Sequence, residues 1–337
     1  MSSASPLVSV IIPFYNAQKT LNEAIESIAK QTLEQFECIL VNNNSSDGSV
    51  EIAQAWVEKD SRFKLVHEKQ QGVMFASNKG SACAIGKYIA RMDADDISLP
   101  NRLQAQSEFL DSSPEYGAVS GLVEYVPHHA NTEGFQRYVY WVNSVRSYAE
   151  ILNNMFVESP IVNPTAMWRK ELTDTHGMYK HGEFPEDYEL WLRWLNNGVK
   201  ICKLDKPVLK WFDSETRLTR THPIYSDDAF YNIKTQYLTK WLKKNNPNYP
   251  HVAVWGASRI SRNRNKLLGE YGIEISCYID IKKSRQLDRE VVFYEDIPEP
   301  GPLFILVYMK NQDAKKKIQQ FLVSRNYLEG KHYIFVS

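Results

Sequence analysis

Blocks of apolar and polar residues alternate along the first 125 residues. Four short apolar runs, most of them rich in β-branched residues, have the pattern of buried strands: 8–14, 36–41, 63–68 and 87–92. Between them, apolar residues recur at helical spacing and predict helices over about 17–31 and 73–86. We therefore expect a mainly parallel sheet with right-handed crossovers. In such sheets, ligands bind beyond the carboxyl ends of the strands.

The rest of the sequence divides at a polar, proline-containing break over 243–250. Before this break aromatic residues are dense, and helices are predicted over 185–198 and about 226–244. After it the alternation of strands and helices restarts, which predicts a small separate α/β domain. The expected parts of the chain are 1–125, 126–248 and 249–337.

Composition narrows the class of protein. The 337 residues carry 40 basic and 40 acidic side chains, and this balance argues against a nucleic-acid partner. No apolar run approaches the ~20 residues of a membrane-spanning helix, and the N-terminus lacks the pattern of a signal peptide. The four cysteines are far apart, which favours neither a disulfide framework nor a zinc site. We expect a protein of the reducing cytoplasm, with peripheral membrane association left open.

Three aspartates follow the fourth predicted strand within four positions, at 93, 95 and 96. On an extended segment Asp93 and Asp95 point to the same side, so Asp96 is expected to point elsewhere. Two carboxylates at one point suit Mg²⁺ or Mn²⁺, which prefer oxygen ligands and often bridge to phosphates. The alternative is a cluster of acids that caps a helix beginning near Pro100.

Four segments in order resemble one protein family. They are "VSVIIPFYNAQKTLNEAIESIAKQT", "ECILVNNNSSDGS", "GVMFASNKGSACAIGKYIARMDADD" and "FPEDYELWLRW". Over roughly residues 6–222 the chain resembles the family-2 glycosyltransferases of the GT-A fold. The resemblance implies an α/β fold with a Rossmann-like mixed sheet, helices on both faces, and the small C-terminal α/β domain appended. It implies inverting transfer of a sugar from a nucleotide-sugar to an acceptor hydroxyl.

The resemblance also implies which residues bind the donor. The loop of Pro13, Tyr15 and Asn16 would lie along the base and ribose, although such residues also simply end a strand. Asn42 and Asn43 stand where many relatives have an acid that pairs with uracil. They could still bind a base edge, so a UDP-sugar is the expected donor, with the base left open.

Further along the chain, the resemblance makes Asn78 an expected donor-binding residue and gives Arg217 a place near the donor diphosphate, although Arg217 could instead be a surface charge. Asp93 and Asp95 match the DxD metal motif of the family, with Asp93 also on the donor side and Mg²⁺ or Mn²⁺ bridging the diphosphate. His222 is an expected further metal ligand, although a lone histidine usually is not one.

Asp187 matches the general base of the family. Glu186 is expected to hold the acceptor or to orient the loop. Acids in the first turn of a helix also simply favour its dipole, which is the structural alternative. That dipole leads us to expect Asp187 to be ionised at pH 7.

The C-terminal part has strand, glycine turn and helix in the order of a dinucleotide fold. Gly256 is present, but serines occupy the other two glycine places of the fingerprint, so an accessory module is expected rather than a second catalytic centre. This part is also where peripheral membrane or protein contact is expected.

The leading hypothesis is a glycosyltransferase for surface polysaccharide or another glycan, with a glycan or lipid-linked acceptor. The alternatives are a sugar-nucleotide-binding or scaffold protein with a degenerate site, and a nucleotidyltransferase or NAD-dependent oxidoreductase. Donor hydrolysis with Mn²⁺ would separate an enzyme from a binding protein.

Overall fold

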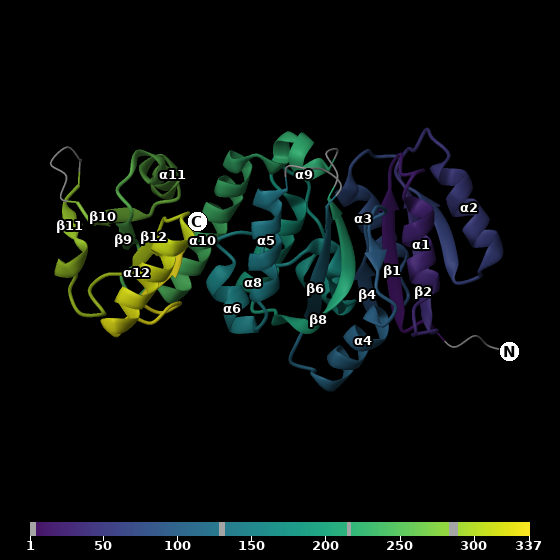
Figure 1. Ribbon diagram of the computed structural model, residues 1–337, viewed down its shortest axis with the longest axis horizontal. Coiled ribbons are helices and arrows are strands. Elements are labelled where there is room, and N and C mark those ends of the chain that lie inside the picture. Colours follow the sequence, from purple (N-terminus) through teal and green to yellow (C-terminus); the bar gives the residue numbers. More distant parts are fainter. Residues whose placement is uncertain (1–4, 128–131, 214–216, 283–288) are drawn as a thin grey trace. The chain divides into compact units, whose positions relative to one another are not determined.

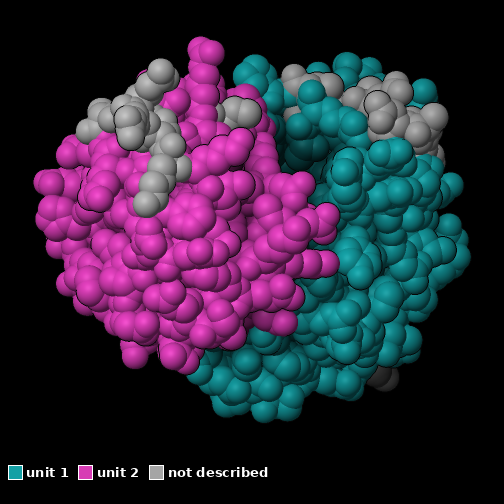
Figure 2. Space-filling view, turned by 60° about the vertical axis from the view of Figure 1, so that its left-hand side comes forward, with its two compact units in different colours: residues 1–148, 160–225 teal, residues 149–159, 226–337 magenta. Residues whose placement is uncertain are grey.

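The computed structural model describes residues 5–127, 132–213, 217–282 and 289–337 (Figure 1). The chain forms two compact units, drawn in different colours in Figure 2. Unit 1 comprises residues 1–148 and 160–225, and unit 2 comprises 149–159 and 226–337. Each unit is built on a sheet of its own, eight-stranded in unit 1 and five-stranded in unit 2.

The first half of the large sheet has the predicted parallel strands. They are β1 (Val8–Phe14), β2 (Phe36–Asn42), β3 (Phe63–His67) and β4 (Tyr88–Arg91), in the spatial order β3-β2-β1-β4. The connecting helices are α1 (Leu21–Ala29), α2 (Ser49–Lys59) and α3 (Val73–Cys83). Every residue of β1 and β2 is buried, as expected for central strands covered on both faces.

The second half makes the sheet mixed, as predicted. Beyond β4 come β7 (Met167–Arg169), β6 (Ala118–Pro127), β8 (Ile201–Asp213) and β5 (Ile97–Ser98). β7 runs antiparallel to β4 and β6, whereas β6 and β8 are parallel. The helices of this half are α4 (Arg102–Ser112), α5 (Glu133–Ser144), α7 (Glu171–His176), α8 (Glu186–Asn196) and α9 (Leu218–Thr221), with 3-10 turns at Asn163–Thr165 and Pro223–Tyr225.

Three tryptophans fix α8 against the sheet. Trp191 and Trp194 of α8 and Trp168 of β7 are fully buried, with ring centroids 5.6–6.3 Å apart in edge-on arrangements. Such aromatic pairs contribute stability beyond the area they bury. This cluster holds the first turn of α8, which carries Glu186 and Asp187, in a rigid position.

The sheet of unit 2 is wholly parallel, in the order β11-β10-β9-β12-β13. Its strands are β9 (His251–Trp255), β10 (Glu274–Asp280), β11 (Val291–Phe293), β12 (Ile305–Val307) and β13 (Tyr333–Phe335). The helices are α10 (Asp227–Asn245), α11 (Arg259–Glu270) and α12 (Gln312–Ser324), with a 3-10 turn at Tyr294–Asp296, and α6 (Tyr148–Asn154) leads into the unit.

The long helix α10 packs with the C-terminal sheet. Trp241 of α10 meets Phe304 next to β12 and Phe156 of the 149–159 segment, at ring-centroid distances of 5.9 and 6.0 Å. The compact units therefore divide at residue 225, whereas the domain limits predicted from the sequence are 125 and 248. Among the described helices, none combines the length and apolar character that crossing a bilayer requires.

Gly80 of α3 allows that helix to lie directly on the sheet. A Cβ at this position would come within 2.5 Å of the Ile11 side chain and 3.0 Å of the Val41 side chain. Both neighbours are buried β-branched residues of β1 and β2, so they have little room to move. Packing therefore requires a small residue at this position.

We predict that Gly80→Ala lowers the free energy of unfolding by about 1–3 kcal/mol through overpacking. Gly134→Ala is the matched control, because a Cβ there meets no atom within 4 Å. That variant should be neutral or slightly stabilising, since alanine favours a helix. Urea denaturation of both variants checks the prediction, and equal stabilities would contradict it.

Candidate active site

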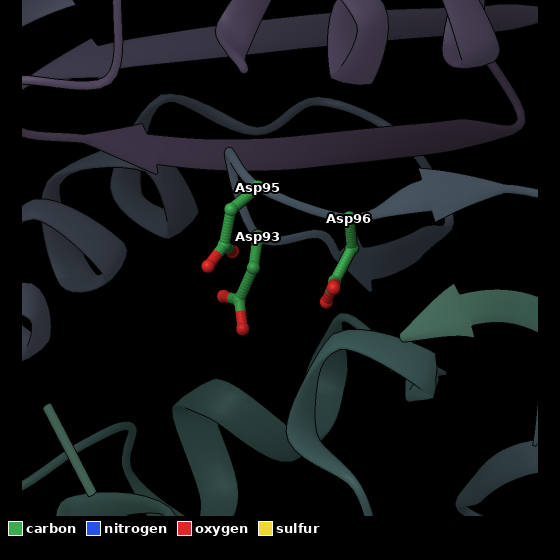
Figure 3. Close-up of side chains that lie close together, drawn as sticks. All are labelled: Asp93, Asp95 and Asp96. Atoms are coloured by element: carbon green, nitrogen blue, oxygen red, sulfur yellow. The ribbon is translucent and has the colours of Figure 1, made fainter. Parts of the chain in front are cut away.

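An acidic loop follows β4 at the centre of the large sheet. One carboxylate oxygen from each of Asp93, Asp95 and Asp96 lies within 4.8 Å of the others (Figure 3). The expectation that Asp96 points elsewhere is therefore wrong. Residues 94–95 form a turn instead of extended strand, so the alternation of side chains does not apply and all three carboxylates converge.

The charge of this loop is only partly compensated. Buried Arg91 pairs with Asp93 at 2.6 Å, and the Phe212 amide donates to Asp96 Oδ1 at 3.0 Å. Asp96 Oδ2 is buried with no hydrogen-bond partner among the described residues. Burial, followed by the neighbouring carboxylates, raises the pKa of Asp95 and raises that of Asp96 further. An additional positive charge would stabilise the ionised loop.

Residues 217–222 form a basic segment that carries Arg217, Arg220 and His222. Arg217 of this segment lies within electrostatic range of Asp95 and Asp96 in the acidic loop. Its Nη1 donates to the Phe212 carbonyl at 2.9 Å, and its guanidinium lies over the Trp211 ring at 4.6 Å. The positive charge of Arg217 opposes the rise in the pKa of both Asp95 and Asp96. The structure thus places this predicted donor-binding residue beside the predicted metal ligands.

The other members of the basic segment are placed differently. Arg220 pairs with buried Asp213 at 2.7 Å, a structural ion pair at the end of β8. His222 is exposed and accepts from the Ile224 amide through Nδ1 at 3.4 Å. Among the described residues, the group of side chains that could hold a metal ion consists of Asp93, Asp95 and Asp96, and His222 is not part of it.

The first turn of α8 supplies two further carboxylates. Tyr225 donates its hydroxyl to Glu186 Oε2 at 2.7 Å, and the Tyr188 amide donates to Asp187 Oδ1 at 2.7 Å. Burial is the largest cause that raises the pKa of Glu186 and that of Asp187, and the Asp93 charge adds to both. The acids of α8 and the acidic loop after β4 therefore form one electrostatic site.

Asp187 differs from the sequence expectation in its ionisation. Burial and then the Glu186 charge raise the pKa of Asp187 to about 8, so the group holds a proton at pH 7 in the protein alone. The dipole of α8 favours the ionised form, but these two effects are larger. This raised pKa runs against the expectation of an ionised base at pH 7.

The loop after β1 presents one exposed aromatic side chain. Pro13 is buried within β1, whereas Tyr15 is 54% exposed. Asn16 has a left-handed backbone at φ 48°, and its Oδ1 accepts from the Ser46 amide at 2.8 Å. Of these three predicted donor-binding residues, Tyr15 has the side chain that is free to stack on a ligand.

Asn42 and Asn43 are buried and hold the loop after β3. Asn43 Nδ2 donates to the carbonyls of Glu68 and Gln70, and its Oδ1 accepts from the Gly72 amide. Asn42 is bonded to the ring of the histidine that ends β3 and to an amide in its own turn. Both hydrogens of the Asn43 amide are used within the protein, so this side chain supports the loop in the unliganded state.

Asn78 of α3 holds another segment of the site. Its side chain donates to the Tyr179 carbonyl at 2.8 Å and accepts from the Tyr179 amide at 3.2 Å. Tyr179 in turn donates its hydroxyl to Asn163 Oδ1 at 2.8 Å. These contacts make Asn78 a positioning residue for the segment that precedes α8.

Two residues of the site are not predicted by the sequence reasoning. Arg91 is a charged residue inside an apolar strand, a signal that could have marked it as a partner for the following aspartates. Tyr225 lies 39 residues from Glu186 in the chain and has no local pattern that would indicate the contact.

Comparison with protein families gives a match over the N-terminal half. Residues 9–177 match the family described as glycosyl transferase family 2. The chain is 32% identical over 245 residues to an uncharacterized glycosyltransferase of Haemophilus influenzae, covering 71% of this chain and 75% of the relative. It is 30% identical over 209 residues to the amylovoran biosynthesis glycosyltransferase AmsE of Erwinia amylovora, covering 60% and 75%.

Two solved structures share the fold. TarS 1-349 of S. aureus in complex with UDP-GlcNAc has a TM-score of 0.54 at 19% identity, over 78% of this chain and 71% of that chain. The mannosyltransferase PcManGT of Pyrobaculum calidifontis, in complex with GDP-Man and Mn²⁺, has a TM-score of 0.51 at 19% identity, over 72% and 65%. The sequence matches and this shared GT-A-like fold agree, and the chain belongs to glycosyl transferase family 2.

Proposed function

We propose that this glycosyltransferase moves a sugar from a nucleotide-sugar to an acceptor hydroxyl with inversion and with the aid of a divalent cation. The observation that carries the proposal is one site in which Asp93, Asp95 and Asp96 converge beside Arg217 and within electrostatic range of Glu186 and Asp187. A cation site, a phosphate-binding cation and a candidate base are the parts that such a transfer requires.

The acidic loop fits Mg²⁺ or Mn²⁺. Its donors are carboxylate oxygens, which these ions prefer, and the buried Asp96 Oδ2 lacks a partner among the described residues. Asp93 and Asp95 would hold the ion, with His222 a further proposed ligand. A bound ion would supply Lewis acidity that stabilises the charge of the departing diphosphate. Arg217 would add a second positive charge on the same side.

Asp187 is the proposed general base. It must lose its proton before it can accept one from the acceptor hydroxyl, and its pKa of about 8 opposes this in the protein alone. Neutralising the charge of Asp93 removes one of the causes of that raised pKa. Binding of a cation in the acidic loop would therefore favour the ionised form of Asp187. Glu186, fixed by Tyr225, would orient the acceptor side.

For the donor we propose a UDP-sugar. Support comes from the shared fold with a structure in complex with UDP-GlcNAc, while the related structure with GDP-Man makes GDP-sugars the next class to test. Tyr15 is the proposed stacking residue for the base, in the loop that includes Pro13 and Asn16. Asn42, Asn43 and Asn78 would act mainly by holding the loops that surround the donor.

We propose that the acceptor is a glycan or a lipid-linked glycan and that the product is a polysaccharide. Similarity to the AmsE protein of amylovoran biosynthesis supports this assignment. We place the reaction in the cytoplasm, with peripheral membrane contact through the C-terminal unit.

A second candidate is a protein that binds a sugar-nucleotide without transferring the sugar. It is favoured by one observation, the use of the Asn43 amide for loop contacts where many relatives have an acid. Release of nucleotide from a panel of UDP-, GDP- and dTDP-sugars, with and without Mn²⁺, distinguishes the two functions.

We predict different defects for Asp95→Asn and Asp187→Asn. Asp95→Asn should lose at least about 100-fold in transfer together with stimulation by Mn²⁺, because a neutral amide holds the ion poorly. Asp187→Asn should lose about 10²–10⁴-fold in transfer but bind the donor normally, because a base acts on the acceptor. Nucleotide release and calorimetric donor binding measure the two effects.

Asp174→Asn, which changes an exposed acid of α7, is the control and should keep full activity. Removal of metal by EDTA should abolish transfer and Mn²⁺ should restore it. Normal transfer by either site variant would overturn the corresponding role.

A pH-dependent stability difference should accompany the buried acid. The pKa of Asp187 is raised to about 8, above the ~3.9 of an unfolded aspartate. Between these values the unfolded state releases its proton first, so the wild-type protein loses stability as pH rises from 4 to 8. In EDTA, Asp187→Asn should therefore gain stability relative to wild type by at least about 1.4 kcal/mol more at pH 8 than at pH 4.

Urea denaturation at the two pH values measures this difference. Asp174→Asn again serves as the control and should track the wild type. A gain for Asp187→Asn that is independent of pH would show that burial does not raise the pKa of this carboxyl.

A further inference from the structure

The sheet of unit 2 has a topological switch point between β9 and β12. The chain runs outward from β9 to β10 and β11 on one side, and from β12 to β13 on the other. The turns after the two central strands adjoin, since the Tyr308 amide donates to the Trp255 carbonyl and Ser261 Oγ donates to the Tyr308 carbonyl. In open parallel sheets this is the place where ligands bind.

The glycine turn at this point differs from a dinucleotide-binding loop. The Gly256 amide donates to the Ile279 carbonyl, and the Ala257 amide donates to Asp280 Oδ2 at 2.9 Å. The Ser258 hydroxyl accepts from the Ser261 amide and caps α11. Asp280, the residue where a ribose would bind in such folds, is therefore used to hold the turn. Any anion here must be recognised chiefly by side chains.

Four basic side chains from four different segments form one electrostatic cluster, in which Lys310 lies two residues after Tyr308. They are Lys234 of α10, Arg264 of α11, Lys310 after β12 and Lys315 in the first part of α12. Arg264 and Lys310 reach the same Asp227 carboxylate oxygen at 3.6 and 3.5 Å. The Lys234 and Lys315 ammonium groups interact electrostatically with Glu158 and with Lys310.

The local charges are unbalanced. Four basic side chains face two carboxylates, Asp227 and Glu158, and the ion pairs to Asp227 are long. Burial lowers the pKa of Lys234 to about 7 and that of Lys315 to about 8, so the charged forms of both lysines lack full compensation. Lys234 is 5% exposed, and its ammonium has only a 3.4 Å contact to the Val157 carbonyl and the Tyr231 ring at 4.0 Å. Burying an ammonium group without a close anion is costly.

The positions of Lys310 and Lys315 add further positive charge that is only partly compensated. They flank the start of α12 (Gln312–Ser324), where the helix dipole already places positive charge. Lys310 is 61% exposed, so the cluster is open to solvent on one side. Negative charge supplied from solution would stabilise the charged forms of these lysines.

We infer that the switch point of unit 2 is a binding site for a phosphorylated small molecule, recognised by Lys234, Arg264, Lys310 and Lys315. The ligand class is a phosphate ester or diphosphate with about two negative charges, either a nucleotide or a sugar phosphate. The residues of this site belong to unit 2, whereas the acidic loop after β4 belongs to unit 1, and the inference does not depend on the transfer reaction proposed above.

The test uses the full chain carrying Asp95→Asn, in EDTA, so that metal-dependent donor binding does not contribute. Inorganic pyrophosphate is titrated by calorimetry into this protein and into the same protein with Lys310→Gln and Lys315→Gln. We expect saturable binding that weakens at least tenfold in the double variant. Lys316→Gln with Lys317→Gln, two exposed lysines of the same helix, is the matched control and should bind within twofold of the parent.

UDP and glucose 1-phosphate are titrated in parallel arms. Tighter binding of UDP than of pyrophosphate, lost in the double variant, identifies a nucleotide site in unit 2, and tighter binding of glucose 1-phosphate, lost in the same way, identifies a sugar-phosphate site. If circular dichroism shows that the double variant is not folded, the single variant Lys310→Gln, which changes a largely exposed side chain, is titrated instead. Absence of pyrophosphate binding, or equal loss in the control, would overturn the inference.

Discussion

Repulsion among carboxylates at the centre of the large sheet is the constraint on which the site depends. The acidic loop after β4 holds three aspartates, and α8 brings Glu186 and Asp187 into the same field. Arg91 and Arg217 offset only part of this charge, and water screens the buried Asp96 and Glu186 poorly. The fold retains the cluster because buried tryptophans and the packing of α3 on the sheet hold its supports in place. We propose that a cation and a phosphate ligand complete this site.

The sequence predicts most of the fold because strand and helix periods are strong in the parallel half. The strands β1 to β4 and the helix α8 lie within a residue or two of the expected positions, and the mixed sheet is confirmed. The short strand β5 has no comparable period and is fixed by pairing with β8, which the local pattern does not contain. Likewise α10 packs with the C-terminal sheet through Trp241. This tertiary contact cannot be predicted from the polar break that follows the helix in the sequence.

The candidate site residues could be chosen from the sequence by residue type, but their local geometry could not be predicted from it. The aspartates after β4 are identified, but the turn at 94–95 redirects Asp96 into the cluster. The dipole of α8 is real, yet burial and the adjacent Glu186 outweigh it at Asp187. Asn43 is found in the right loop, although its amide is used for internal contacts. Each outcome is decided by a turn, by burial or by a contact between residues distant in sequence. These features exist only in the folded chain.

Binding of Mn²⁺ to the wild-type protein, followed by electron paramagnetic resonance with and without a nucleoside diphosphate, tests the central claim most directly. We expect weak binding of the ion alone and binding at least tenfold tighter with UDP or GDP, because the carboxylates and the diphosphate together complete the coordination. If the Mn²⁺ spectrum with each diphosphate is the same with and without the protein, the carboxylate cluster does not serve as a cation site.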